Sequence, residues 1–456
     1  MLRKLIRFTL RRTPTPWPLR MDRESLTDTD FIDIRDLRSN GYGSTLLNTT
    51  FRSLKHRNYR LYFFGQLVSF IGSWMQSAAL MWLVFEQTND ALWPPLLLVA
   101  TVGPTLFLGP VGGILADRFP KKKVIFVAQC AFLLTSLSLV ALLATGAAAP
   151  GILLLVAFCN GVIQAIDVPT RLAFVPDLVP REDLINAVSL NSLLFNSARA
   201  VGPALAGVLF LMAEEWPGGR PVMIGATACF LINSVSYGAV LLALRKISVG
   251  GEPFPHRERG AFFEGLHYVR AHPTLAVLLV LTGLLSIFGW PTLTLFPAYT
   301  KFVLGHSEKE YSLLVSALGG GALVGALTTA TYGSIARRGL LLTVGAGLSA
   351  LGILGLAFAR TIGPAAGCAA ALGFGLIVFL STGQSILQLS VDGVRRGRVL
   401  ALWAMTLSAS APLGHLIAGF AARSYPIPDV LLVLAAGAGV TTVLVAALAK
   451  WGLGRG

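Results

Sequence analysis

A short charged loop from Gly113 to Lys123 combines one acid with several bases. It reads GILADRFPKKK, so Asp117 is followed at once by Arg118, with Lys121 and Lys122 after a turn. A carboxylate at the end of a helix can pair with a nearby base or with the positive end of a helix dipole. The pattern predicts a gating loop, a charge lock whose bond breaks when two parts of the chain separate. The simpler interpretation is an ordinary basic loop.

Arg199 is a single basic residue deep inside the apolar segment 186–212. An unpaired charge is costly in apolar surroundings, so we expect its side chain to face the protein interior. None of the 22 acidic residues lies at comparable depth in such a segment. Two roles stay open. Arg199 contacts an anionic or carbonyl-rich ligand, or it is structural and bonds Gln76, Asn196 or carbonyls freed by Pro203.

Polar and aromatic side chains recur inside otherwise apolar segments. Ser69, Ser73 and Gln76 share one helix face, because they are spaced by three to four residues. Gln384 and Gln388 are one helical turn apart and must point the same way. The other members of this set are Asn160, Gln164, Asn191, Arg199 and Trp290. As a set they predict a wet, largely uncharged substrate cavity, whereas each alone is better explained by a hydrogen bond between helices.

Two residues are candidates for proton coupling. Asp167 lies near the end of the apolar segment 151–169, and Arg171 follows it by one helical turn. His415 lies inside the segment 399–422, and a histidine can titrate near neutral pH. The alternative for each is a structural role with a fixed partner, which for Asp167 would be Arg171.

The elements that carry these residues are long and apolar. The chain of 456 residues is 54% hydrophobic and 13% charged, against about 25% charged in soluble domains. Twelve apolar segments are predicted, at 59–85, 92–115, 124–146, 151–169, 186–212, 221–244, 274–300, 311–332, 340–359, 362–387, 399–422 and 428–449. Each can cross a bilayer as a helix, and they are too long for barrel strands. We therefore expect an all-α membrane protein with twelve transmembrane helices.

The basic residues are distributed unevenly among the connections. The tails and the even-numbered connections hold 31 of the 37 Lys and Arg residues, and the odd-numbered connections hold five. Lys and Arg accumulate on the cytoplasmic side of membrane proteins, so both termini are predicted to be cytoplasmic. The net charge of +15 reflects this asymmetry, and no nucleic-acid partner is expected.

The two halves of the chain repeat the same local patterns. GILADR at 113–118 corresponds to GSIARR at 333–338, and GPALAG at 202–207 corresponds to GHLIAG at 414–419. Parallel six-helix repeats around a central site are a transporter architecture. The predicted organisation is a disordered cytoplasmic tail (1–52), an N-terminal six-helix half (53–246), a cytoplasmic linker (247–272), a C-terminal six-helix half (273–450) and a cytoplasmic tail (451–456).

The loop GILADRFPKKK resembles the cytoplasmic signature of the major facilitator superfamily. Four further stretches are similar to one bacterial subgroup of it: GSWMQ at 72–76, LVPREDLINA at 178–187, ARAVGP at 198–203 and RGRV at 396–399. That subgroup contains enterobactin-type siderophore exporters, macrolide efflux proteins and transmembrane secretion effectors. The resemblance covers residues 51–450 and implies the twelve-helix fold and export driven by the proton gradient.

The pair Gly202 and Pro203, with Gly207, resembles the antiporter signature of the same superfamily. Glycine lets helices approach closely, and proline removes a backbone hydrogen bond, so the segment can act as a hinge. Simple close packing of helices explains the same residues equally well.

Together these features predict a secondary active transporter in the bacterial inner membrane. We expect a proton-driven exporter of a small amphipathic molecule, a siderophore-like metabolite or a drug, that works by alternating access as a monomer. The alternatives are an importer or lipid transporter of the same superfamily, or a membrane partner or sensor that does not transport. No nucleotide-binding loop or hydrolase motif is present, so no enzyme is expected. Neither a metal nor a cofactor is expected; the partners are the lipid bilayer and the substrate.

Overall fold

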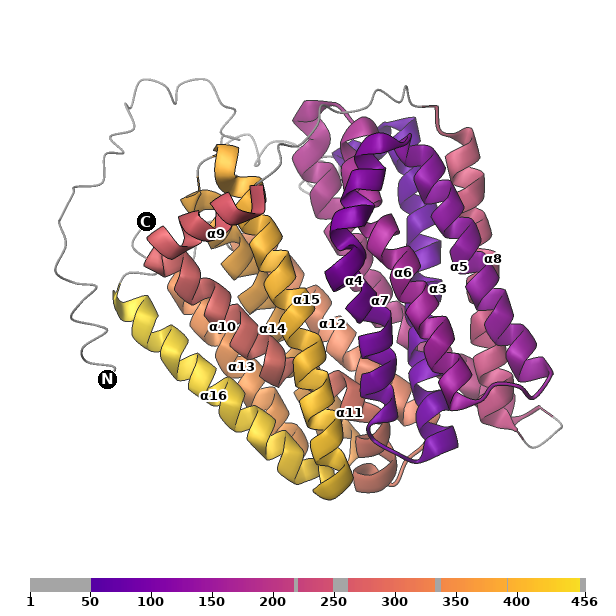
Figure 1. Ribbon diagram of the computed structural model, residues 1–456. Helices are drawn as coiled ribbons and strands as arrows, with labels where there is room; N and C mark the ends of the chain where they lie inside the picture. The colour runs from indigo at the N-terminus through magenta and orange to yellow at the C-terminus, as the bar shows by residue number, and fades with distance from the viewer. Residues whose placement is uncertain (1–50, 217–219, 249–260, 333–337, 392, 452–456) are drawn as a thin grey trace, which may run out of the picture. The chain divides into compact units, whose positions relative to one another are not determined.

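The computed structural model describes residues 51–216, 220–248, 261–332, 338–391 and 393–451 (Figure 1). The predicted tail at 1–52 therefore lies almost wholly outside the described residues. Every regular element in the described part is helical.

Six long helices form the N-terminal half. They are α3 (Arg57–Thr88), α4 (Trp93–Arg118), α5 (Lys121–Ala144), α6 (Pro150–Phe174), α7 (Leu184–Glu214) and α8 (Pro221–Lys246). Three of them, α4, α6 and α8, have proline in the first turn, where the missing N–H costs no hydrogen bond. Helix α3 ends at Thr88, and the next residue, Asn89, adopts a left-handed conformation with φ of 49°. Short 3₁₀ turns precede α3 (Arg52–Lys55) and follow α6 (Val175–Asp177 and Arg181–Asp183).

The C-terminal half begins with a short helix, α9 (Ala261–Ala271), and continues with six spans. The first span is built from α10 (Pro273–Gly289), α11 (Pro291–Tyr299) and a π-helical turn (Thr300–Leu304). The others are α12 (Glu308–Tyr332), α13 (Arg338–Phe358), α14 (Ile362–Ser390), α15 (Gly393–Ser424) and α16 (Ile427–Trp451). Because Pro291 removes a backbone donor, the first span is interrupted at Trp290. The sequence patterns did not predict this interruption.

The predicted all-α fold with twelve membrane spans is confirmed in the described residues. Eleven helical elements are long and apolar enough to cross a membrane, and α4 adds a shorter apolar stretch, Trp93–Gly109. Large apolar side chains are exposed on their outer faces, such as Phe107 at 77% and Val235 at 71%. In water such exposure would be unfavourable, whereas lipid tails solvate these groups.

Two helix pairs make the largest contacts between the halves: α7 packs on α12, and α4 packs on α15. Small residues bring the first pair close together. A Cβ atom added at Gly319 would lie 2.5 Å from the carbonyl oxygen of Arg199, and one at Gly207 would lie 2.9 Å from the Cβ atom of Ser312. Neither position can hold a larger residue without moving a helix.

The helices run roughly side by side in Figure 1, so the bundle has two ends. We call the end where α3 begins and α8 finishes the inner end, and the end where α3 finishes and α4 begins the outer end. These names follow the charge-based prediction of orientation.

Candidate functional site

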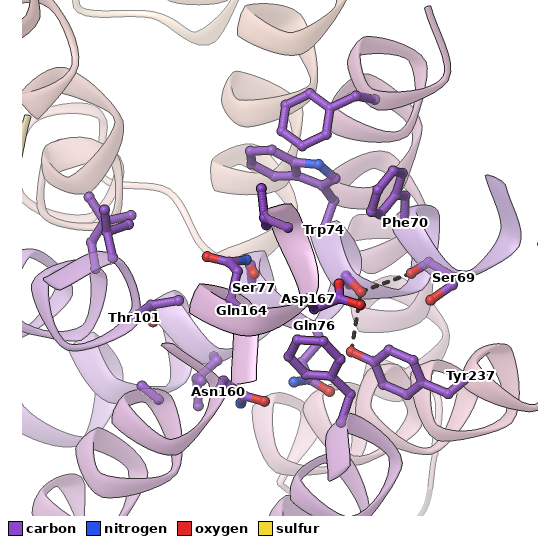
Figure 2. Close-up of a pocket in the computed structure, with 18 of the residues that line it drawn as sticks. Ser69, Phe70, Trp74, Gln76, Ser77, Thr101, Asn160, Gln164, Asp167 and Tyr237 are labelled. Carbon is purple, nitrogen blue, oxygen red and sulfur yellow. Dashed lines mark hydrogen bonds between the residues drawn. The ribbon is translucent and has the colours of Figure 1, made fainter. Parts of the chain in front are cut away.

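A cavity of about 370 Å³ lies in the N-terminal half (Figure 2). Helices α3, α4, α5, α6, α7 and α8 supply its lining, and Leu293 of α11 is the one contributor from the C-terminal half. Side chains from α3 and α6 meet across this space in Figure 2. The cavity therefore belongs almost entirely to one half of the molecule.

Several of the predicted site residues line this cavity. They are Ser69, Ser73 and Gln76 on α3 with Asn160, Gln164 and Asp167 on α6. Asn191 on α7 instead lines a neighbouring cavity of about 250 Å³, which shares Phe70, Arg171 and Phe195 with the first. Gln384 and Gln388 are exposed on α14 and line neither cavity. The structure thus brings together most of the predicted residues of the first half, whereas Arg199, Trp290, Gln384 and Gln388 line neither cavity.

An ion pair lies in the cavity wall. The Nε atom of Arg171 is 2.7 Å from Oδ2 of Asp167, one helical turn earlier on α6. The Asp167 side chain is 1% exposed and also accepts a 3.4 Å hydrogen bond from Gln129. Arg171 reaches Gln66 at 3.3 Å, and its guanidinium lies 4.6 Å from the ring centre of Phe70. The pair gives the cavity both signs of charge without a net charge.

Gln76 belongs to a network that joins three helices. Its Oε1 atom accepts hydrogen bonds from Ser136 of α5 at 2.7 Å and from Asn233 of α8 at 2.8 Å. Tyr237 lies 3.2 Å from the hydroxyl of Ser73, which donates to the carbonyl of Ser69 (Figure 2). Because its acceptor oxygen is already occupied, Gln76 contributes to helix packing as well as to the cavity surface.

Four polar lining residues were missed by the sequence patterns: Ser77, Thr101, Gln129 and Tyr237. Each is a polar side chain in an apolar segment, which is the signal that selected the others. The aromatic side chains of Phe70 and Phe132 had no comparable signal, because phenylalanine is common throughout such segments.

Two lysines of the gating loop bind residues of the N-terminal half or of the linker that follows it. Lys121 lies 2.8 Å from Asp177, and Lys122 donates to the carbonyl of Ile247 at 2.6 Å. Arg118 is exposed, and a Cβ atom at Gly113 would meet nothing within 4 Å. The side chain of Asp117 lies outside the described residues, so its lock stays a prediction.

At the outer end, three ion pairs connect the two halves. Lys301 of the first C-terminal span lies 2.9 Å from Glu86 of α3 and bonds Asn89 at 2.8 Å. Arg423 of α15 binds Asp90 through two nitrogens, and its Nε atom is 3.0 Å from each carboxylate oxygen. The third pair joins Lys309 of α12 to Glu214 of α7 at 3.8 Å. We call these three pairs the outer lock.

The Arg423 guanidinium holds the pKa of the Asp90 carboxyl below its usual range. Its hydrogen bonds to the carboxylate are the largest cause, and the backbone N–H of Leu92 adds a further bond at 3.0 Å. Asp90 therefore stays charged at every pH at which the protein would work.

The hinge-like motif of α7 lies against α3. A Cβ atom at Gly202 would sit 2.6 Å from the Cβ atom of Trp74, and Pro203 lies inside the helix. One turn before this motif, Arg199 is 4% exposed, and Trp74 and Trp290 flank its guanidinium. The motif thus lies where α7 meets both α3 and the other half.

His415 lies in the C-terminal half, away from the cavity lining. It is 2% exposed on α15, and its Nδ1 atom is 2.9 Å from the hydroxyl of Thr294 on α11. This geometry matches the structural alternative for His415, since the ring has a fixed partner. Among the described residues, no group of His, Cys, Asp or Glu could hold a metal ion.

A helical bundle in two halves, a cavity in its interior and a set of ion pairs that hold one end together define a membrane transporter of the major facilitator type. Solved transporters share the fold. The nucleoside transporter NupG superposes with a TM-score of 0.66 at 13% identity, over 86% of this chain and 98% of that one. A bacterial homologue of the iron transporter ferroportin superposes with a TM-score of 0.64 at 18% identity, over 88% and 99%.

The chain belongs to the transmembrane secretion effector family, whose profile matches residues 48–451. Enterobactin exporters EntS are similar over most of their length. Those of Citrobacter koseri and of Shigella boydii serotype 18 are each 28% identical to this chain, over 82% of it and 87% of the relative. The protein is therefore a multi-pass transporter of the bacterial inner membrane, and the resemblance of its sequence motifs to this subgroup is confirmed.

Proposed function

We propose that the protein exports a small amphipathic, siderophore-like molecule by alternating access, driven by the proton gradient. The observation that carries this proposal is the cavity of about 370 Å³ in the N-terminal half, at whose outer side three ion pairs hold the two halves together. In this proposal the described state is the one that receives substrate from the inner side. The direction of transport rests on relatives that are named as exporters.

The cavity lining favours an amphipathic substrate. Its volume lies in the range of small-molecule sites, which is about 300–1,000 Å³. Aromatic faces of Phe70, Trp74 and Phe132 offer apolar contact, while Asn160 and Gln164 offer neutral donors and acceptors. A ring-bearing molecule with several polar groups would satisfy both surfaces. We propose that the substrate is not chemically changed and that the protein works as a monomer.

Proton coupling is assigned in this proposal to Asp167. In the state described, Oδ2 of Asp167 lies 2.7 Å from Nε of Arg171, and the proposal takes this pair as ionised. When the outer side opens, protonation of Asp167 breaks the pair, and Arg171 is free to change partners. Return to the inner side restores the pair and releases the proton inward. Substrate leaves in the opposite direction, which is the exchange that an antiporter needs.

The test is mass spectrometry of the medium and cytosol from a deletion strain and its complemented parent, with and without iron. Export predicts a compound that is lost from the medium and retained in the deletion strain, and iron dependence would identify a siderophore. The opposite shift would mean uptake and would overturn the direction. A second strain, complemented with Asp167→Asn, tests the assigned coupling residue. We expect it to lose export to the same extent as the deletion strain.

A further inference from the structure

Arg199 lies between two indole rings that come from different halves. The Cζ atom of its guanidinium is 5.9 Å from the ring centre of Trp74 on α3 and 4.9 Å from that of Trp290. Trp290 stands at the interruption between α10 and α11. All three residues are near the middle of their spans. The guanidinium is thus held at mid-depth, where the N-terminal half meets the C-terminal half.

One edge of this guanidinium has no partner. The Nε and Nη2 atoms of Arg199 are buried and make no hydrogen bond, and no ion pair in the described ranges involves this residue. The bonds to Gln76 and Asn196 that the sequence suggested do not form. The Oε1 atom of Gln76 accepts from Ser136 and Asn233 instead, and the Asn196 amide donates to the carbonyl of Ser192 while its Oδ1 atom is buried without a partner. The N–H groups of Nε and Nη2 lie along one edge within the guanidinium plane and form a two-pronged donor.

The outer lock shows what that edge does elsewhere in the same protein. Arg423 uses its Nε and Nη2 atoms to hold both oxygens of the Asp90 carboxylate. The spacing of the two donors matches two neighbouring oxygens in one plane, which is why arginine binds carboxylates through two parallel bonds. Arg199 presents the same edge, with no carboxylate on it.

We propose that Arg199 is a subsite for a planar oxyanion carried on an aromatic ring of the substrate, such as an aryl carboxylate. The two oxygens take the Nε and Nη2 edge, while the ring packs on the face of Trp74 or Trp290. The inference rests on the proposed function, since it names the class of substrate that the cavity accepts. It explains why an unpaired arginine is kept at mid-depth, where a neutral residue would be easier to bury.

Access to this subsite depends on the two halves moving apart. Trp74 lines the cavity, so Arg199 lies directly behind one wall of it. The backbone of Arg199 is tightly packed against Gly319 of α12, and Trp290 belongs to the other half. Opening of the outer end must shift Trp290 relative to Trp74 and uncover the guanidinium edge. Binding should therefore be stronger when the outer lock is weakened.

The experiment compares benzoate with benzamide, which have the same shape but differ in charge. Purified full-length protein carrying Glu86→Gln and Asp90→Asn would be titrated with each compound and followed by tryptophan fluorescence. We expect benzoate to bind at least about tenfold more tightly than benzamide. Arg199→Gln should remove this preference, and Arg199→Lys should keep part of it, because lysine retains the charge without the fork. The matched control is Arg360→Gln, at an exposed arginine just beyond the end of α13 that donates to the carbonyl of Ala357.

Two outcomes would overturn the proposal. One is equal affinity for benzoate and benzamide while Arg199 is intact, which needs no substitution at Arg199 and so does not depend on how its variants fold. The other is a preference for benzoate that persists in Arg199→Gln. Because this readout is binding to purified protein, its failure leaves the export measured in cells untouched, and a failure of export would leave the binding preference measurable.

Discussion

The two ends of the bundle are held together in different ways. At the outer end, three ion pairs connect the N-terminal half to the C-terminal half. At the inner end, the described ion pairs stay inside the N-terminal half: Lys121 with Asp177, and Asp183 with Arg52 and His56. The first set has to break when the outer end opens, whereas the second set moves as one body with its own half.

This difference shows how weak interactions can still control access. Solvent-exposed ion pairs contribute little one at a time, because water screens them and ordering the side chains costs entropy. Opposite charges placed across one gap act together, and an equilibrium between two states responds to a small difference in free energy. A lock built from exposed pairs can therefore hold one end closed and still open in every transport cycle.

Breaking the buried pair of Asp167 and Arg171 should have the largest effect. Arg171→Gln leaves the Asp167 carboxylate, 1% exposed, without its cation. Removing one partner of a buried pair costs about 3–5 kcal/mol, so we expect a clear fall in thermal stability and loss of transport. Unfolding in detergent and transport in proteoliposomes would measure both. The double variant with Asp167→Asn should recover the stability but not the transport; equal stability of the single and double variants would contradict this assignment.

Asp117→Asn tests whether an ion pair also joins the two halves at the inner end when that end is closed. If Asp117 joins the halves when the inner end closes, we expect flux to fall by roughly tenfold and inner accessibility to rise. Transport by the purified variant and maleimide labelling from the inner side would measure the two effects. Asp177→Asn is the control, since this acid pairs with Lys121 inside one half. Unchanged flux and unchanged labelling for Asp117→Asn would remove the lock.

Weakening the outer lock should have a moderate effect on the equilibrium between states. Glu86→Gln with Asp90→Asn removes the acids of two pairs across the halves. A cysteine at Leu293, the one cavity residue from the other half, would report access from outside in a cysteine-free background. We expect labelling by an impermeant maleimide to become several-fold faster.

The control for that experiment is Glu310→Gln. Glu310 is also at the outer end, but it bonds Ser307 within its own half. Exchanging the charges, with Glu86→Lys and Lys301→Glu together, should restore slow labelling. If the exchanged pair labels as fast as the weakened lock, the charges do not hold the halves together.

Moderate changes of pH should have a smaller effect on the outer lock than any of the substitutions above. Arg423 lowers the pKa of Asp90, so the pair is fully formed above the usual carboxyl value of about 3.9 and is lost only as pH falls through the lowered pKa. We therefore expect outside labelling of the Leu293 cysteine to stay constant between pH 5 and pH 8 relative to an exposed reference cysteine, because the thiolate fraction of any cysteine itself rises with pH. A rise in labelling at pH 5 would mean that a group other than Asp90 controls closure.

The sequence predicted more of the fold than of the site. Twelve spans, two six-helix halves and the unusual depth of Arg199 all follow from which residues are apolar and how far apart they lie. These are local properties, because the length and hydropathy of a segment determine whether it can cross a bilayer. The closeness of Asp167 and Arg171 was also foreseeable, since four residues make one turn of the same helix.

Only the tertiary structure decided which distant residues meet. Lys301 and Glu86 are 215 positions apart, and Arg423 and Asp90 are 333 apart, so no local pattern connects them. The same holds for Trp74 and Trp290 on either side of Arg199. Whether a polar residue faces the cavity, another helix or the gap between halves depends on the rotation of its helix and on the packing of small residues. Those are set by contacts between helices, which composition and spacing along one chain do not specify.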